Sequence, residues 1–268
     1  MGGEIWFEGE DMLQAKPARL REIRGSKISV IFQDPMTSLN PVYSVGDQIA
    51  EVIHQHEKCS KEEGRRKAGD MLEMVGIPRA RYDEYPHQFS GGMKQRVVIA
   101  MSIACSPELI LADEPTTALD VTIQAQILEL MMDLKEKLGM AIIMITHDLG
   151  IVARMCEKIA VMYAGKIVEY GTTDEIFYEP KHEYTKGLLR SIPRLDSRDH
   201  ERLVPIEGTP VDMLNPPKGC PFAPRCGACM KVCLREMPPR TDFSDTHYTQ
   251  CWLCQKAEFE AAQGGNVQ

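Results

Sequence analysis

The chain has 268 residues, 43% of them hydrophobic, and its 39 acidic and 31 basic side chains give a formal net charge of −8. That length accommodates one large α/β domain with an appendage, and the charge argues against nucleic acid as a partner. No apolar run approaches the roughly 18 residues of a membrane span, since Val97–Cys105 and Ala141–Ile145 are much shorter. The first residues also lack the basic segment and apolar core of a signal peptide. We therefore expect a cytoplasmic protein whose link to a membrane runs through a partner.

The first residues predict a strand, a helical segment and a second strand, followed by a loop. Ile5–Phe7 reads as a short strand, Arg19–Arg24 as a polar helical piece, and the apolar run Ile28–Phe32 as a buried strand. Two prolines and an asparagine make Asp34–Pro41 a loop. Gln33 stands between this strand and this loop, where its amide can reach a metal ion or an attacking water.

Two amphipathic helices are predicted next, Val45–His56 and Lys61–Val75. A third helix begins at Ser90, Gly91 and Gly92. A small hydroxyl and two glycines at a helix start leave the backbone N–H groups accessible. Such N–H groups form a phosphate-binding site, called here the phosphate seat.

A carboxylate pair follows this helix. Leu109–Ala112 reads as a strand buried on both faces, and Asp113 and Glu114 come at its C-terminal end, where α/β sheets bind ligands. A phosphate seat followed closely by two carboxylates predicts nucleotide hydrolysis.

The remaining elements alternate between helix and strand as far as about Pro193. The sequence predicts a long helix Val121–Leu138, a buried strand Ala141–Ile145 followed by His147, a strand pair Ile159–Tyr163 and Lys166–Glu169 across Ala164-Gly165, and short helices Asp174–Tyr178 and Glu183–Ser191. After Pro193 the chain is rich in proline and poor in helical periodicity, so we expect a second, smaller unit there.

The stretch Phe89–Asp120 resembles the ABC-transporter ATPase family, with its signature sequence, Walker B strand and D-loop in the family's order. Phe32–Pro41, Tyr184–Asp196 and Cys220–Cys226 narrow the resemblance to D-type nucleotide-binding subunits of dipeptide and oligopeptide importers. It covers nearly the whole chain, from Gly3 to Cys251. Nickel importers share much of the pattern and remain an alternative.

The resemblance implies an α/β fold, namely a RecA-like ABC ATPase core that is incomplete at its N-terminus, with a helical subdomain and a small Cys-rich C-terminal extension. The expected division is 1–33 as a remnant of the core, 34–106 as the helical subdomain with the signature, 107–180 as the core with Walker B and the switch histidine, and 181–268 as the extension.

The resemblance also assigns roles at a site for ATP and Mg²⁺. Glu114 would polarise the attacking water, Gln33 would sense the metal, and His147 would contact the γ-phosphate. Asp113 would hold Mg²⁺. The residues expected to close over the nucleotide of an opposite subunit are Ser90, Gly91, Gly92 and Gln95, and Asp120 belongs to the D-loop.

The 268 residues contain no P-loop of the form G-x-x-x-x-G-K-S/T, which holds the β- and γ-phosphates in this family. Gly165-Lys166, the only Gly-Lys pair, has Ala160 in place of the first glycine and Ile167 after the lysine. We therefore expect little ATPase activity from this chain alone.

The expected partners are a second ABC ATPase subunit, transmembrane permease subunits and, indirectly, a solute-binding protein, at the cytoplasmic face of a membrane. One alternative is an ABC fragment that acts as a metal-binding module. Another is an ATPase of the chromosome or DNA-repair kind, but the stretch between Gln33 and Ser90 lacks the sustained heptads of their coiled coils.

Six of the nine cysteines lie between Cys220 and Cys254, which in a reducing compartment points to metal more than to disulfides. Two C-x-x-C pairs, Cys226/Cys229 and Cys251/Cys254, are close to a zinc-ribbon pattern. The family pattern instead uses Cys220, Cys226, Cys233 and Cys251, and related importers carry a four-iron four-sulfur cluster there. Unligated thiols are the remaining possibility. A tail so poor in apolar periodicity is expected to need such a cross-link to become ordered.

Overall fold

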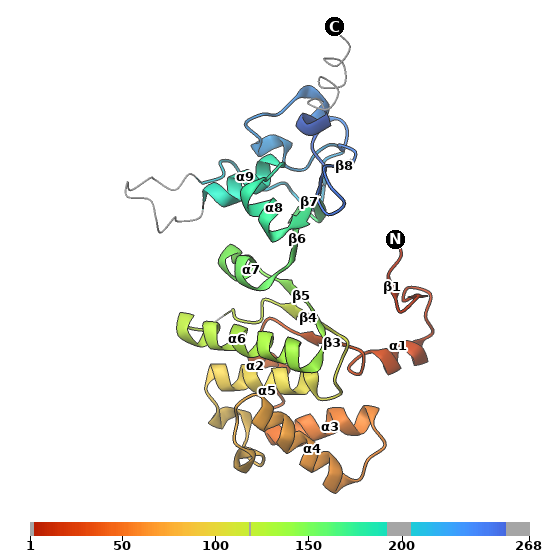
Figure 1. The fold of residues 1–268 in the computed structure, drawn as a ribbon, viewed down its shortest axis with the longest axis vertical. Coiled ribbons are helices and arrows are strands. Elements are labelled where there is room, and N and C mark those ends of the chain that lie inside the picture. Colours follow the sequence, from red (N-terminus) through yellow and green to blue (C-terminus); the bar gives the residue numbers. More distant parts are fainter. Residues whose placement is uncertain (1–2, 118, 192–204, 256–268) are drawn as a thin grey trace. The chain divides into compact units, whose positions relative to one another are not determined.

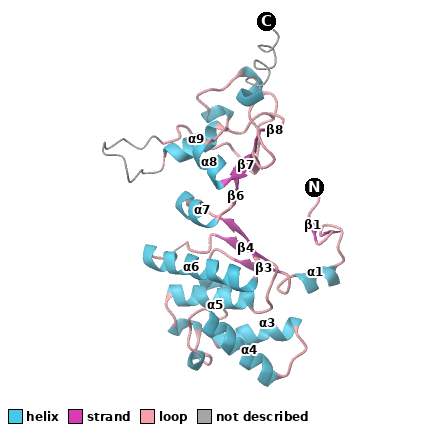
Figure 2. Cartoon of the chain, viewed as in Figure 1, coloured by secondary structure: helices cyan, strands magenta, loops and turns pink. Residues whose placement is uncertain are grey.

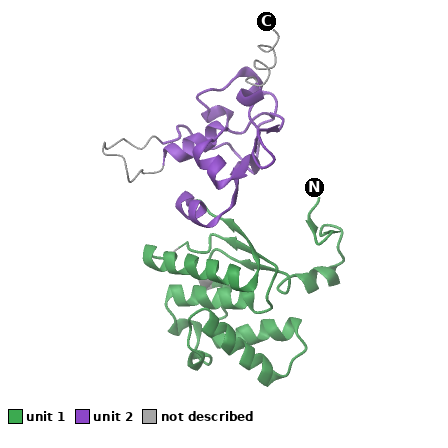
Figure 3. Ribbon diagram, in the orientation of Figure 1, with its two compact units in different colours: residues 1–147 green, residues 148–268 purple. Residues whose placement is uncertain are grey.

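The computed structural model describes residues 3–117, 119–191 and 205–255. The chain forms two compact units, residues 1–147 and 148–268 (Figure 3). The second unit begins at Asp148 and therefore contains the 158–172 hairpin as well as the cysteine-rich extension. The finer division at 33, 106 and 180 stays a prediction.

The first unit is mostly helical around a small sheet (Figure 2). Its elements are β1 (Trp6–Phe7), β2 (Glu10–Asp11), α1 (Pro17–Ile23), β3 (Ile28–Ile31), α2 (Pro35–Ser38), α3 (Val45–His56), α4 (Lys61–Met74), η1 (Arg79–Arg81), η2 (Pro86–Gln88), α5 (Gly91–Ile103), β4 (Leu109–Asp113), α6 (Val121–Leu138) and β5 (Ala141–Ile145).

The predicted bounds of α3 and α6 are confirmed, because local signals fix both ends of these helices. The side chains of Ser44 and Asp120 accept backbone N–H groups at the two N-termini. Gly139 adopts a left-handed conformation, φ 64°, just after α6. The expected loop at 34–41 is corrected, since it contains the one-turn helix α2, in which Pro35 takes the first position that tolerates proline.

Strands β3, β4 and β5 form a parallel sheet in that order. Helix α5 packs on β3 and on α6, and α3 and α4 lie on the far side of α5 (Figure 1). The core of this unit is built from apolar side chains such as Ile31, Ile99, Ile110, Ile127 and Leu134.

Strand β5 does not have the burial that its sequence predicts. It lies at the edge of the described sheet, and Ile143 and Ile145 are 53% and 54% exposed. The prediction of a buried strand is therefore wrong for β5, because the burial of a strand depends on its neighbours as well as on its own apolar residues.

The second unit joins the hairpin to the extension. Its elements are α7 (Leu149–Met155), β6 (Lys158–Tyr163), β7 (Lys166–Thr172), α8 (Thr173–Tyr178), α9 (Glu183–Arg190), η3 (Ala223–Arg225), η4 (Lys231–Leu234), β8 (Thr241–Asp242) and β9 (Tyr248–Thr249). An antiparallel sheet runs in the order β6-β7-β9-β8. The predicted hairpin is confirmed, with Ala164 and Gly165 both at positive φ in its turn.

The extension has an apolar core after all. Cys220, Phe222 and Cys233 cluster with Val161 and Val168 of the hairpin. The tail is therefore not without a hydrophobic core, although its sequence lacks apolar periodicity. Its need for a metal cross-link stays a prediction. In the described part of the chain, no helix is both long and apolar enough to cross a membrane.

Candidate functional site

Three predicted catalytic residues follow three adjacent parallel strands. Ile31 pairs with Ala112, and Asp113 pairs with Ile145, so the carboxyl ends of β3, β4 and β5 meet at one edge of the sheet. The structure brings Gln33, Glu114 and His147 together at that edge, where the sequence predicted a nucleotide site.

The Glu114 carboxylate is the centre of this group. His147 Nδ1 lies 2.8 Å from Glu114 Oε1, and Gln33 Nε2 donates to Oε2 at 2.8 Å. The Thr117 hydroxyl donates to Oε2 as well, at 2.9 Å. The hydrogen bond from His147, and then that from Thr117, hold the pKa of Glu114 below its ordinary value. Glu114 is therefore an ionised proton acceptor held in a fixed orientation.

The backbone at Glu114 departs from the strand. Its φ is 44°, a left-handed conformation that is unfavourable for a residue with a long side chain. Its N–H nevertheless donates to Ile145 O at 2.9 Å, which ties the turn to β5. Asp113 is the last residue of β4 and directly precedes this turn. Strain of this kind often accompanies functional positions.

The N-terminus of α5 presents the predicted phosphate seat. Ser90 caps the helix by accepting Met93 N–H at 3.4 Å, and both Ser90 and Gly91 are exposed. Gly92 is required for packing instead, because a Cβ at this position would lie 2.4 Å from Ile123 Cγ2 of α6. The seat therefore consists of Ser90 and Gly91, while Gly92 permits the close packing of α5 on α6.

Gln95 and Asp120 make contacts within the chain. Gln95 is buried, and its amide donates to Pro115 O at 2.6 Å, which links α5 to the loop after β4. Asp120 accepts Ile123 N–H at 3.0 Å as the N-cap of α6. Their roles toward nucleotide stay predictions.

One alternative loses support from the fold, and the lack of a P-loop at Gly165-Lys166 agrees with the local structure. The described helices between Gln33 and Ser90 are short, and the longer ones, α3 and α4, have 12 and 14 residues, so this segment holds no long coiled coil of the chromosome-type ATPases. The Gly165-Lys166 pair forms a hairpin turn rather than a phosphate loop.

The second unit contains the candidate metal ligands. Cys220, Cys226, Cys233 and Cys251 all line one small cavity of about 20 Å³. Cys229 is exposed, and neither it nor Cys254 lines the cavity. The structure therefore brings together the four cysteines of the family pattern and leaves out the other two.

The donor set of this cavity suits a metal–thiolate centre, but the cavity is not yet arranged for one. In residues 3–117, 119–191 and 205–255, no three His, Cys, Asp or Glu side chains form a metal-holding group. The volume is about that needed for one water molecule, so a cluster requires outward movement of the lining. Burial raises the pKa of Cys226 to about 11, which makes it a neutral thiol without metal.

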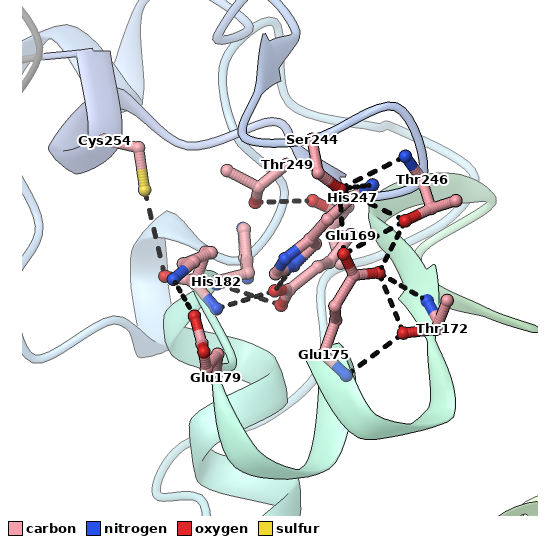
Figure 4. A network of polar contacts seen from close by, with 12 residues as sticks. Glu169, Thr172, Glu175, Glu179, His182, Ser244, Thr246, His247, Thr249 and Cys254 are labelled. Atoms are coloured by element: carbon pink, nitrogen blue, oxygen red, sulfur yellow. Dashed lines mark hydrogen bonds and ion pairs between the residues drawn. The ribbon is translucent and has the colours of Figure 1, made fainter.

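Two glutamates that the sequence analysis missed anchor segments that lie next to cavity residues in the sequence. Figure 4 shows their polar contacts. The fully buried Glu169 accepts the backbone N–H groups of Lys181 and His182, at 2.6 and 3.0 Å, and lies 2.9 Å from His247 Nε2. His182 itself lines the cavity, and burial lowers its pKa to about 4.

The second glutamate, Glu175, fastens the segment just before Cys251. It accepts Thr172 N–H at 2.8 Å and the hydroxyls of Ser244 and Thr246 at 2.8 and 3.0 Å. Only the contact with Thr172 has a sequence signal, because threonine followed three residues later by glutamate is a capping box.

Comparison with known proteins identifies the family of the chain. Residues 1–117 match the family model "ABC transporter", and residues 168–233 match "Oligopeptide/dipeptide transporter, C-terminal region". The chain is 57% identical to the oligopeptide transport ATP-binding protein OppD of Bacillus subtilis, over 94% of this chain and 71% of that protein. It is 54% identical to the dipeptide transport ATP-binding protein DppD of Bacillus subtilis, over 98% and 79%.

A solved structure is similar as well. The ATP-binding cassette MJ0796, a dimer bound to ADP and Pi, aligns with a TM-score of 0.57 and 29% identity over 64% of this chain and 74% of that one. The fold is thus that of an α/β ABC ATPase cassette.

Proposed function

The chain belongs to the family of ATP-binding subunits of oligopeptide and dipeptide ABC transporters, and on that premise we propose that it supplies part of the ATP-hydrolysing site of a peptide importer. The observation that carries the proposal is the convergence of Gln33, Thr117 and His147 on Glu114 at the edge of the sheet. A nickel importer of the same architecture is the alternative substrate class.

In this proposal Glu114 accepts a proton from the water that attacks the γ-phosphate. Its carboxylate is held ionised and oriented by Gln33 and His147, so no rearrangement is needed before proton transfer. Mg²⁺ would neutralise phosphate charge, and Asp113, at the end of β4, is the residue that would hold it through water. His147 is exposed enough to leave Glu114 and meet the γ-phosphate.

The exposed N-terminus of α5 serves the nucleotide of a second ATPase subunit. Ser90 and Gly91 offer a hydroxyl and unpaired backbone N–H groups, which bind phosphate oxygens at the positive end of a helix. Gln95 supports this end from within, through its contact with Pro115. Two such subunits, paired head to tail, would each complete the other's site.

These 268 residues contain no P-loop. In this proposal, the groups that bind the β- and γ-phosphates next to Glu114 are therefore supplied by other polypeptide. Among the described residues no strand pairs with the outer edge of β5, and this edge with its exposed Ile143 and Ile145 suits a further strand carrying a P-loop. A P-loop makes several charge-assisted contacts, each worth about 1.5–3 kcal/mol. Calorimetry with Mg-ATP tests this: the chain alone should bind weakly, and micromolar affinity would contradict the proposal.

We place the chain at the cytoplasmic face of a membrane, as a peripheral subunit bound to permease subunits. Phe32, Val42 and Tyr43 lie on either side of the 34–41 segment in the sequence and are 62%, 72% and 54% exposed, so each is available to a partner. Co-expression with the permease and a second ATPase subunit should yield a complex. Co-purification with no ABC component would count against this role.

The four-thiolate cavity is proposed to hold a four-iron four-sulfur cluster, with zinc as the alternative. Cys220, Cys226, Cys233 and Cys251 would be the ligands, and the centre would supply a structural cross-link. Anaerobic purification should give a brown protein whose colour is lost with Cys233→Ser and kept with Cys254→Ser. A colourless protein with one zinc, lost on changing Cys229 or Cys254, would reverse the assignment.

A further inference from the structure

One histidine shares the wall of the four-thiolate cavity. His182 is only 2% exposed, and it lines the cavity together with Cys220, Cys226, Cys233 and Cys251. It directly precedes α9 and caps the first turn of that helix. A buried imidazole at this position can serve a metal centre in the cavity either as a ligand or as a hydrogen-bond donor.

The helix cap decides between these two roles. His182 Nδ1 accepts the backbone N–H of Tyr184 at 3.0 Å, so this nitrogen carries no proton. The single ring proton of the imidazole is then on Nε2. A ring nitrogen that carries a proton has no free lone pair for a metal ion. While the cap is in place, His182 is therefore a donor through Nε2–H and not a ligand.

This Nε2–H is not used elsewhere in the described chain. Among the residues that the structure describes, none accepts a hydrogen bond from His182 Nε2. Because Nδ1 is turned toward the backbone of α9, the part of the ring left to reach the cavity is the outer edge that carries Nε2. Trp252, the other lining residue with a side-chain N–H, already donates it to Glu236 O at 3.0 Å. His182 thus holds the one uncommitted side-chain N–H among the described residues of the cavity wall.

The backbone of His182 is fixed by a buried carboxylate. Glu169 of β7 accepts the N–H of His182 at 3.0 Å and that of Lys181 at 2.6 Å, and it lies 2.9 Å from His247 Nε2. These hydrogen bonds tie the start of α9 to a strand of the sheet. Hydrogen bonds that fix a side chain beside a metal site determine which atom it presents to that site. His182 therefore presents its Nε2–H from an anchored part of the wall.

We propose that His182 donates its Nε2–H to a sulfur atom of the metal centre, as a positioning residue and not as a fifth ligand. This inference rests on the proposed four-thiolate centre. Four thiolates give the centre a net negative charge whether they hold an iron–sulfur core or zinc. No lysine or arginine is among the described residues that line the cavity. A buried negative charge is costly unless hydrogen bonds compensate it, and His182 is placed to supply one.

A redox titration of the full chain, purified anaerobically with its cluster, tests this donor. Hydrogen bonds to the sulfurs stabilise the more negative, reduced form and so raise the reduction potential. His182→Ser keeps a good N-cap for α9, but its hydroxyl is too short to reach the centre. Thr185→Val is the matched control. Thr185 lies in the same helix, is also 2% exposed and does not line the cavity, and its hydroxyl has no hydrogen-bond partner among the described residues.

We expect the parent and Thr185→Val to have the same reduction potential. In His182→Ser the equilibrium constant for reduction should fall at least about tenfold, which lowers the potential of a one-electron couple by about 59 mV. Equal potentials in the parent and His182→Ser would overturn the inference. If the parent holds zinc instead, His182→Ser should bind Zn²⁺ about tenfold more weakly in competition with a chelator. Equal zinc affinities would overturn it as well.

A measurement on the metal-free chain tests the tautomer by itself. Nitrogen-15 NMR of the imidazole should place the His182 proton on Nε2, and a proton on Nδ1 would overturn the inference. A parent chain that binds neither iron nor zinc would refute the metal centre and this inference with it. A parent that binds either metal, with no effect of His182→Ser, would refute the inference alone. Both outcomes leave the Glu114 site untouched.

Discussion

The Glu114 carboxylate lies 2.8 Å from His147 Nδ1, and it extends from a backbone whose φ is 44°. A carboxylate only accepts hydrogen bonds, so the Nδ1 of His147 carries the proton. The two residues follow neighbouring strands, β4 and β5, whose register fixes the distance between them. Several expectations depend on this pair.

Removing the Thr117 hydroxyl should raise the pKa of Glu114. Thr117→Val preserves the shape and loses a hydrogen bond to the ionised form, whereas Thr117→Ser keeps it. His147→Ala should raise the pKa further, since the His147 contact is its largest cause. A carboxyl with a depressed pKa stabilises the fold above its unfolded-state pKa, and this contribution is lost as the pH falls through the folded value. NMR titration of the Glu114 carboxyl carbon measures the shift, and equal pKa values in Thr117→Val and Thr117→Ser would contradict the role.

The left-handed backbone at Glu114 should make glycine better tolerated there than alanine. Both Glu114→Gly and Glu114→Ala lose the carboxylate and its three contacts. Only alanine keeps a Cβ at φ 44°, which costs roughly 1–2 kcal/mol. Denaturant unfolding should therefore find Glu114→Gly the more stable by about 1 kcal/mol. At Asp113, within β4, the control variant Asp113→Ala should be more stable than Asp113→Gly. If Glu114→Ala is more stable than Glu114→Gly, the backbone at Glu114 is not strained.

Gly92→Ala should destabilise the first unit while Gly91→Ala should not. A Cβ at Gly92 meets Ile123 Cγ2 at 2.4 Å, whereas a Cβ at Gly91 meets Leu119 Cδ2 at an ordinary 3.6 Å. The expected loss is about 1–3 kcal/mol for Gly92→Ala, measured by denaturant unfolding. Adding Ile123→Ala should recover part of it by restoring space. A similar loss at both glycines would mean that packing on α6 is not what distinguishes them.

Low pH should destabilise the second unit, because Glu175 becomes protonated. Hydrogen bonds, first from the Thr172 backbone, lower its pKa from 4.5 to about 2. Its stabilising effect is therefore complete above pH 4.5 and lost as the pH falls toward 2. The difference in free energy of unfolding between the parent and Glu175→Gln should be constant near neutral pH. It should fall toward zero between pH 4.5 and pH 2. Asp174→Asn, on the exposed side of α8, is the control, and a difference that persists at the acid end would contradict the assignment.

Local sequence signals predicted much of this architecture. Amphipathic patterning predicted α3 and α6, whose ends the structure shows to be fixed by Ser44, Asp120 and Gly139. Ala164-Gly165 between two β-rich runs predicted the 158–172 hairpin. The family resemblance assigned Gln33, Glu114 and His147 to one site, and each of them also follows a predicted strand.

Other features could not be predicted because they depend on residues far apart in the chain. Glu169 looks like any polar residue of a hairpin strand until His247, 78 positions later, packs beside it. The exposure of Ile143 and Ile145 reflects the absence of a described neighbour beyond β5, which the apolar sequence of the strand does not reveal. The sequence after Pro193 lacks helical periodicity, yet Cys220 and Phe222 pack against apolar side chains of β6 and β7.

The steady-state rate of ATP hydrolysis by the chain joined to a P-loop-bearing cassette segment tests the central claim most directly. We predict turnover by the joined protein in the presence of its second ATPase subunit. Glu114→Gln should bind Mg-ATP as the parent does but hydrolyse it about 10²–10⁴-fold more slowly, since it cannot accept the proton of the attacking water. Turnover by Glu114→Gln at the parent rate would contradict the assignment of Glu114 and, with it, the proposed hydrolytic site.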